Sequence, residues 1–197
     1  MSHIYPSSPP PSSVTIRSVS QSLVSYSQSG RRFARDMGGH RWLVTATYDR
    51  LTNDEGREFQ AFALAQSGQL QSFQAVFPHL APRGVATGAP LVNGATVSGR
   101  SIPTDGWSPN TVNILRQGDY IKFGHSKIYM ITSDANSNLS GQVTLSIEPP
   151  LMVALSDNES ITVNDVPFTL AFAKNTQEFP AQSPVYYRYE ADMEEVY

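Results

Sequence analysis

The sequence contains no cysteine, which excludes disulfide bonds, thiolate catalysis and zinc sites built on cysteine ligands. Charged residues are also scarce, at 16% of the chain, and the net charge is −3. Duplex-binding proteins usually carry a basic patch, whereas the one short basic cluster here is Arg31, Arg32 and Arg35. We therefore expect no sequence-specific nucleic acid binding.

Long hydrophobic runs are also missing. The purest apolar stretches, such as Leu151 to Leu155, are far too short to span a bilayer. The first residues lack the charged and apolar regions of a secretory signal. The sequence thus predicts no membrane insertion, synthesis in a cytosol, and release by a route that needs no cleaved signal.

Motifs that carry chemistry are not found either. The patterns GxSxG, GxGxxG and GxxxxGK[ST] do not occur. The segment "DANSN" at residues 134–138 resembles the start of a calcium loop, but Leu139 and Leu145 stand where that loop needs glycine and glutamate. Four scattered histidines offer no local ligand pair; they are His3, His40, His79 and His125. We expect no catalytic residue, cofactor or metal ligand, and no enzyme activity.

What is present is mostly β pattern. In "RWLVTATYD", residues 41–49, Trp42, Val44, Ala46 and Tyr48 alternate with polar residues, which predicts a strand with one buried face. Residues 1–13 are rich in proline and serine and predict an extended arm. Residues 14–30 predict one or two strands, and Gly38-Gly39 predicts the following turn.

One segment has helical spacing instead. Thr52 and Glu55 stand at the spacing of a capping box, and Phe59 and Phe62 follow on one face. Gly68 is a suitable stop, so a helix is expected over about residues 53–67. A strand over Gln71–Phe77 then completes a first compact unit at Pro78. Trp42, Val44, Phe59 and Phe62 are candidate core residues of that unit.

The middle of the chain predicts a small barrel or sandwich of short strands. Asn93-Gly94 is the best two-residue turn signal, and "DYIKFGHSKIYMIT" predicts a hairpin with its turn at Gly124–Ser126. Further strands are expected over residues 142–148, 151–155, 160–163 and 167–173.

The last strand, "VYYRYEADMEEV", has two distinct faces. Val185, Tyr187, Tyr189, Ala191 and Met193 form an apolar face, of which Tyr187 and Tyr189 are candidate core residues. Such a long strand would be an exposed edge if it stood alone, so we expect it to pair with the first sheet. This predicts residues 79–178 as a small β-barrel domain inserted into a domain formed by residues 1–78 and 179–197.

Three blocks occur in an order typical of one family. "HRWLVTATYDRLTNDEGREFQAFALAQSGQLQSFQAVFP" holds a Trp strand, a capped helix and a strand ending in proline. "PLVNGATVSGRSIPTDGWSPNT" places a Gly-Trp loop before the Gly-Asp hairpin of "LRQGDYIKFGHSKIYMITSDANSNLSGQVTLSIEPPL". From about residue 40 onward, the chain resembles distal tail or minor tail (baseplate hub) proteins of long-tailed bacteriophages.

The resemblance implies a tail-tube-like β-sandwich or barrel with one packed helix, plus an inserted barrel of oligonucleotide/oligosaccharide-binding type. It also implies a structural virion protein, assembled in the host cytoplasm, whose six-fold ring joins the tail tube to the tip. Expected partners are further copies of the chain, the tail tube and tip proteins, and tape measure or fibre proteins. In such a ring, the acidic face formed by Glu190, Asp192 and Glu194 would line the DNA channel, although it is also compatible with an ordinary solvated face.

The inserted barrel also allows a second function, carbohydrate binding. Trp107 could stack on a sugar, which would make the chain a carbohydrate-binding adsorption module of the tail, or it could cap the barrel as a buried residue.

Overall fold

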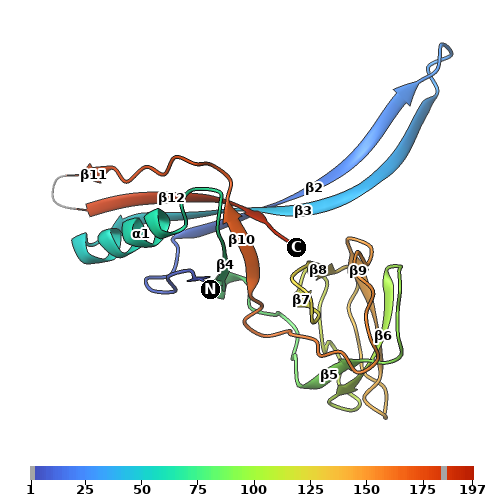
Figure 1. Ribbon diagram of the computed structural model, residues 1–197. Helices are drawn as coiled ribbons and strands as arrows, with labels where there is room; N and C mark the ends of the chain where they lie inside the picture. The colour runs from blue at the N-terminus through green and yellow to red at the C-terminus, as the bar shows by residue number, and fades with distance from the viewer. Residues whose placement is uncertain (1–2, 183–185) are drawn as a thin grey trace. The chain divides into compact units, whose positions relative to one another are not determined.

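The fold was analysed in a computed structural model, which describes residues 3–182 and 186–197. The chain is mainly β with one α-helix, as predicted (Figure 1). It divides into two compact units. The barrel unit contains Met1–Pro10, Phe73–Thr169 and Tyr197, and the sheet unit contains Pro11–Ser72 and Leu170–Val196. The predicted domain boundaries at residues 78/79 and 178/179 stay a prediction.

The first sheet has seven strands in the order β1-β4-β10-β12-β3-β2, with β11 paired to β12. β12 runs antiparallel to β3, so the last strand does return to the first sheet as predicted. Val185, expected at its start, lies outside the described residues. The bounds are β1 (His3–Ile4), β2 (Ser13–Tyr26), β3 (Arg32–Leu51), β4 (Ser72–Ala75), β10 (Phe168–Phe172), β11 (Ala181–Gln182) and β12 (Tyr186–Glu195).

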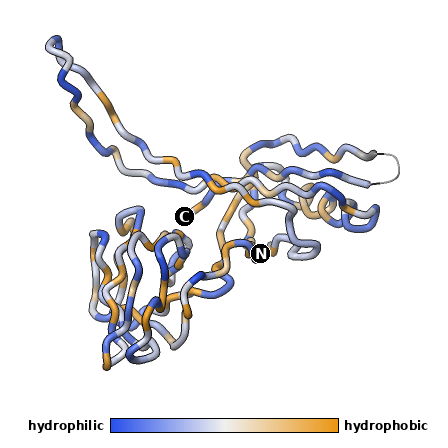
Figure 2. Tube along the Cα trace, turned by 180° about the vertical axis from the view of Figure 1, so that it is seen from behind, coloured by the Kyte–Doolittle hydropathy of each residue, from blue (hydrophilic) through white to orange (hydrophobic). Residues whose placement is uncertain are grey.

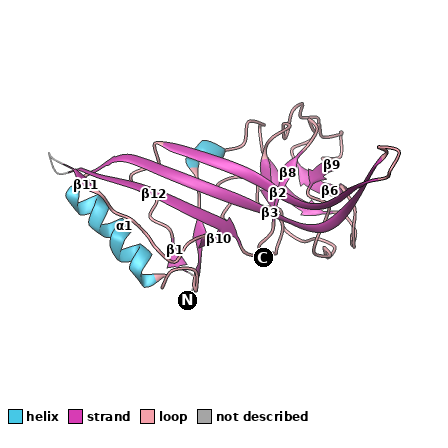
Figure 3. Ribbon diagram, turned by 90° about the horizontal axis from the view of Figure 1, so that it is seen from above, coloured by secondary structure: helices cyan, strands magenta, loops and turns pink. Residues whose placement is uncertain are grey.

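Helix α1 (Asn53–Ala65) packs on β12 and β3 of the sheet unit (Figure 3). The predicted capping box is present: Thr52 Oγ1 accepts a hydrogen bond from the Glu55 backbone N–H, and Glu55 Oε2 accepts one from the Thr52 backbone N–H. The helix ends two residues earlier than predicted, before a turn in which Gly68 adopts a φ of 68°.

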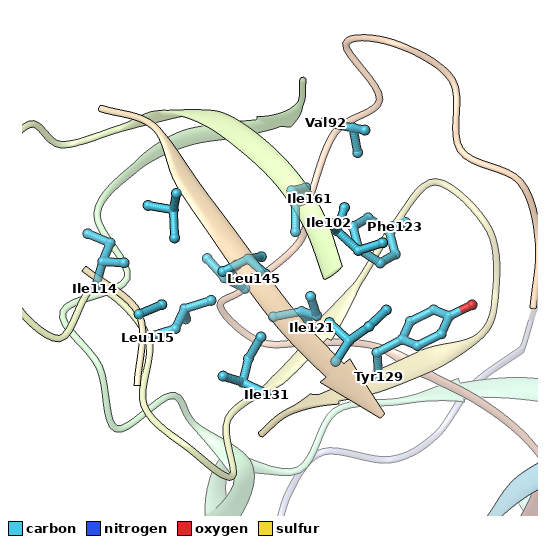
Figure 4. Close-up of a cluster of buried hydrophobic side chains, with 14 of the residues drawn as sticks. Val92, Ile102, Ile114, Leu115, Ile121, Phe123, Tyr129, Ile131, Leu145 and Ile161 are labelled. Carbon is cyan, nitrogen blue, oxygen red and sulfur yellow. The ribbon is translucent and has the colours of Figure 1, made fainter. Parts of the chain in front are cut away.

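The second sheet curves as a half-barrel in the barrel unit, with strand order β5-β6-β9-β8-β7. Its strands are β5 (Gly88–Val92), β6 (Ser101–Trp107), β7 (Tyr120–Lys122), β8 (Ile128–Ile131) and β9 (Val143–Glu148), preceded by the 3-10 turn η1 (Pro78–Leu80). The predicted hairpin around Gly124–Ser126 is confirmed, because Ile121 pairs with Tyr129 across β7 and β8. Aliphatic and aromatic side chains from these strands form one core (Figure 4).

The turn of the barrel unit at residues 116–119 is fixed by one buried carboxylate. Asp119 accepts hydrogen bonds from three backbone N–H groups, at 2.8 Å from Arg83, 3.1 Å from Gly84 and 2.7 Å from Arg116. Because all three donors depend on the same side chain, Asp119 joins the segment before β5 to the start of the hairpin.

Two features of the barrel unit differ from what the sequence predicts. Asn93-Gly94 does not close a two-residue hairpin, because the Gly94 N–H donates to Asp157 Oδ1 and Thr96 pairs with Leu155 instead. The apolar runs at residues 151–155 and 160–163 are not strands; they make isolated bridges, among them Leu91 with Ser160. In both places the backbone N–H and C=O groups are hydrogen-bonded by a side chain or by a single bridge, where a regular strand would have used a neighbouring strand.

The prediction of a turn at Gly38-Gly39 is also wrong. Both glycines lie inside β3 with positive φ, where the register with β2 shifts on either side of Gln21. This irregularity bends the pair of strands, as β-bulges do. The chain turns at residues 27–31 instead, where the Ser27 N–H donates to the Arg31 carbonyl and Gly30 has a φ of 76°.

Candidate assembly surface

The β2–β3 hairpin extends well beyond the rest of the sheet unit (Figure 1). We call residues 21–37 the distal ribbon; it contains the ends of both strands and the turn between them. Every residue of the ribbon is exposed except Ser27, which is half-buried. In contrast, the part of β3 from Trp42 to Tyr48 has one buried face. The bend at Gly38-Gly39 therefore marks the point where the hairpin leaves the core.

Large apolar side chains lie on the ribbon with nothing to cover them. Leu23 is 60% exposed, Tyr26 68%, Phe33 51% and Met37 58%. Figure 2 shows apolar stretches alternating with hydrophilic ones along this part of the chain. An isolated two-stranded ribbon is only marginally stable in water, and clustered exposed apolar residues commonly mark interaction sites. This surface has the composition of an interface.

The apolar residues occupy both faces of the ribbon. Cross-strand partners share a face, so Leu23 with Arg35 and Ser25 with Phe33 define what we call the Arg35 face. Val24 with Ala34 and Tyr26 with Arg32 define the opposite one, the Tyr26 face. A ribbon that is apolar on one face only could lie on its own domain. Apolar residues on both faces suit insertion between other surfaces.

The ribbon is also positively charged. It contains Arg31, Arg32 and Arg35 against one acidic residue, Asp36, whose carboxylate accepts the Gly38 backbone N–H at 2.9 Å. The Arg31 guanidinium lies 5.6 Å from the centroid of the Phe33 ring, a cation–π contact that places a positive charge at an apolar position. The ribbon therefore combines apolar and cationic contacts.

The predicted channel residues all lie on the outer face of β12, away from α1. Glu190 is exposed, and Asp192 and Glu194 are half-buried. Their charges are partly compensated: Glu194 is 3.1 Å from Arg41 and Asp192 is 2.7 Å from Lys174. This face is consequently less acidic than the sequence of the strand alone indicates. Whether it lines a channel stays a prediction.

Asp192 is held by a short network on that face. Lys174 donates to one carboxylate oxygen, and Thr45 Oγ1 donates to the other at 2.9 Å. The Lys174 hydrogen bond lowers the pKa of Asp192 below its ordinary value of 3.8; burial opposes this by a smaller amount, and the hydrogen bond from Thr45 lowers the pKa further. Arg17 donates to the same threonine oxygen at 2.8 Å, so the network connects β2, β3 and β12.

The predicted core residues of the sheet unit differ in depth. Trp42, Val44, Phe59 and Tyr189 are buried, whereas Phe62 and Tyr187 are only half-buried. The Phe59 ring lies 4.5 Å from that of Tyr48 and 5.7 Å from that of Tyr189. Burial also extends to one acidic residue at the end of the last strand, because Glu195 points inward and accepts the Trp42 backbone N–H at 3.1 Å.

The α1–β12 contact requires glycine at one position. Gly56 faces the ring of Tyr187, and a Cβ there would lie 2.7 Å from two ring carbons and 3.0 Å from the Tyr187 Cβ. These atoms belong to the rigid start of the side chain, so little space can be made by rotation. Gly56 is thus retained in the helix for close packing.

Trp107 does not present a stacking surface for a sugar. The side chain is 3% exposed in the core of the barrel unit, and its indole N–H donates to Thr104 Oγ1 at 2.8 Å. The ring is therefore a buried barrel residue, and the glycan candidate is corrected accordingly.

Other candidate chemistry is limited in the described part of the chain. Across residues 3–182 and 186–197, no group of three or more histidine, aspartate or glutamate residues is placed to hold a metal ion. His125 packs against Phe123 and Tyr129, and burial lowers its pKa. Within the same residues, no helix is both long and apolar enough to cross a bilayer.

Comparison with known proteins does not decide the family. No protein-family model matches the chain, and no curated protein matches it. The surfaces described above are therefore the observations that bear on function. The sequence predicted strands over residues 14–30 and a cluster of three arginines, but not that the apolar residues of the ribbon are exposed on both faces. The adjacent apolar pair Leu23-Val24, followed by the turn sequence Ser27–Gly30, was the available signal for a strand exposed on both faces.

Proposed function

We propose that the chain is a structural subunit of a bacteriophage tail, a ring-forming distal tail or baseplate hub protein that joins the tail tube to the tip. The distal ribbon is the single observation that carries this proposal. It extends from the sheet unit with apolar residues on both faces, a form suited to contact with neighbouring subunits. A catalytic or ligand-binding role would not need such a ribbon.

The resemblance to phage tail proteins supplies the biological setting. In this proposal, about six copies close into a ring in the tail of the virion, after assembly in the host cytoplasm. The tail tube, the tip, and tape measure or fibre proteins are the other partners. The carbohydrate-binding alternative depended on Trp107 and is not pursued, because that ring is buried.

The outer face of β12 has a place in this proposal. If Glu190, Asp192 and Glu194 line the channel, DNA phosphates meet a wall whose carboxylates are partly compensated by Arg41 and Lys174. Repulsion from such a wall is weak and is screened within about 8 Å at physiological salt. The wall would prevent adhesion of DNA without obstructing its passage.

Electron microscopy tests the proposed function. Particles of the purified chain are expected to appear as rings with a central opening. An antiserum raised against the chain is expected to label phage tails at the end remote from the capsid. Labelling of the capsid, or virions without any label alongside labelled host cytoplasm, would contradict a role in the tail.

A further inference from the structure

The outer surface of α1 is the natural counterpart of the ribbon in this chain. Its exposed side chains include Asp54, Glu58, Ala61 and Leu64, which recur at helical spacing along one stripe. Leu64 is 74% exposed, and Leu70 just beyond the helix is 76% exposed. Arg57 is also exposed and lies on the same stripe between Asp54 and Ala61, so the first half carries two carboxylates and one cation and the second half is apolar.

The two surfaces are complementary in charge and in polarity. On the stripe, two carboxylates, Asp54 and Glu58, stand against one cation, Arg57, because the Glu55 carboxylate is held by Thr52 in the capping box. The ribbon has three arginines against one aspartate. On the Arg35 face, cationic Arg31 and Arg35 accompany apolar Leu23 and Phe33. Opposite charge therefore accompanies matching apolar contacts, the pattern that gives an interface its orientation.

One copy of the chain cannot bring these surfaces together. Figures 1 and 3 both show α1 along one end of the sheet unit, with the ribbon extending from the opposite end. A contact between them must therefore join two copies. Such a contact uses a different patch on each partner. An interface of this kind produces a closed ring when repeating the same rotation brings the last copy back to the first.

We propose that the Arg35 face of the ribbon of one copy docks on the outer face of α1 of the next copy. Arg35 lies against Glu58, and Leu23, the cross-strand partner of Arg35, lies against Ala61 and Leu64. This inference rests on the proposed function, since it specifies the contact that closes the ring. It leaves the Tyr26 face available for a different neighbour.

The distribution of residues on the ribbon favours a protein partner over a lipid surface. A segment that inserts into a membrane buries apolar side chains in it, so a hairpin that inserted by its tip would need them at the tip. Here the turn consists of Ser27, Gln28, Ser29 and Gly30, and the apolar residues lie behind it on the strands. The tip is therefore the polar part of the ribbon.

Charge reversal and its rescue test the contact. Arg35→Glu and Glu58→Arg are each expected to raise the dissociation constant between copies about tenfold, measured by analytical ultracentrifugation at moderate salt. The double variant is expected to regain most of the affinity because the pair is restored with its signs exchanged. Arg116→Glu, an exposed arginine of the barrel unit, is the matched control and should not change the assembly.

Cross-linking gives a second test that is independent of charge. The chain has no cysteine, so a Leu23→Cys chain mixed with a Leu64→Cys chain should give a covalent dimer with a short bismaleimide reagent. Leu23→Cys mixed with Leu139→Cys is the control, since Leu139 is exposed on the barrel unit, and this mixture should give little dimer.

The outcomes separate this inference from the proposed function. If wild-type chains assemble but neither reversal weakens them, or the double variant stays as weak as the single ones, docking on α1 is overturned while ring formation stands. If wild-type chains stay single at every concentration, both proposals are overturned. Binding of such single chains to vesicles of anionic phosphatidylglycerol would identify the ribbon as a lipid-binding element instead.

Discussion

Replacement of Phe59 by alanine tests the packing of α1 on the sheet. The Phe59 ring is 1% exposed and contacts the rings of Tyr48 and Tyr189. Truncation of a fully buried phenylalanine usually costs about 3–5 kcal/mol, because transfer free energy is lost and a cavity remains. Two aromatic neighbours place Phe59 in the upper part of that range. We expect Phe59→Ala to reduce the free energy of unfolding by about 4–5 kcal/mol.

Phe62 provides the matched comparison within the same helix. It is half-buried, with its ring 6.4 Å from that of Phe172. Because part of the side chain stays exposed, Phe62→Ala should cost less than Phe59→Ala, roughly 2–3 kcal/mol. The sequence spacing alone predicted the same cost for both residues, so the difference between the variants tests the observed orientation of the helix.

The two tryptophans allow each unit to be followed separately. Trp42 lies in the sheet unit and Trp107 in the barrel unit. In a Trp107→Phe background, urea unfolding monitored by fluorescence reports on the sheet unit alone. All variants are compared at one protein concentration, because association adds to apparent stability. A loss below about 1 kcal/mol for Phe59→Ala, or equal losses for both variants, would refute the packing described here.

Three further changes have defined expectations. Asp119→Ala should destabilise the barrel unit by about 3–5 kcal/mol, seen by Trp107 fluorescence in a Trp42→Phe background; an unchanged midpoint would mean that the three N–H donors find water instead. Gly56→Ala should destabilise the sheet unit by about 1–3 kcal/mol, although alanine favours a helix by about 1 kcal/mol, since its Cβ meets Tyr187; a more stable variant would contradict this contact. The folded-state pKa of Asp192 is lowered by Lys174. The contribution of the ionised carboxylate to folding stability is therefore present above the ordinary pKa and is lost as the pH falls through the folded-state pKa. Asp192→Asn should therefore flatten the acid side of the stability profile, and an unchanged profile would refute the linkage.

The regular elements with one buried face were predictable from the sequence. Alternation at Trp42, Val44 and Tyr48 and the capping box at Thr52 both reflect local chemistry, and each predicted the element that is observed. The return of the last strand to the first sheet was predictable because a long apolar strand face needs a partner, but its pairing with β3 was not specified.

The ribbon was not predictable in the same way. A strand exposed on both faces has no inside–outside alternation, so the pattern that identifies buried strands is missing from residues 21–37. Gly38-Gly39 supplies positive φ for a turn or for a bulge alike, and only the pairing with β2 distinguishes them. Charge alone also does not predict exposure: Glu195 is buried, and its carboxylate accepts the Trp42 backbone N–H.

The central claim is that the distal ribbon assembles copies of this chain into a ring. Native mass spectrometry can test it with the full chain and a variant that joins Gln21 to Gly38, which are partners in the β2–β3 register, through an Asn-Gly turn. The full chain is expected to have a fixed multiple of the single-chain mass, and the shortened variant the mass of one folded chain. A single-chain mass for the full chain, or an intact ring without the ribbon, would contradict the account.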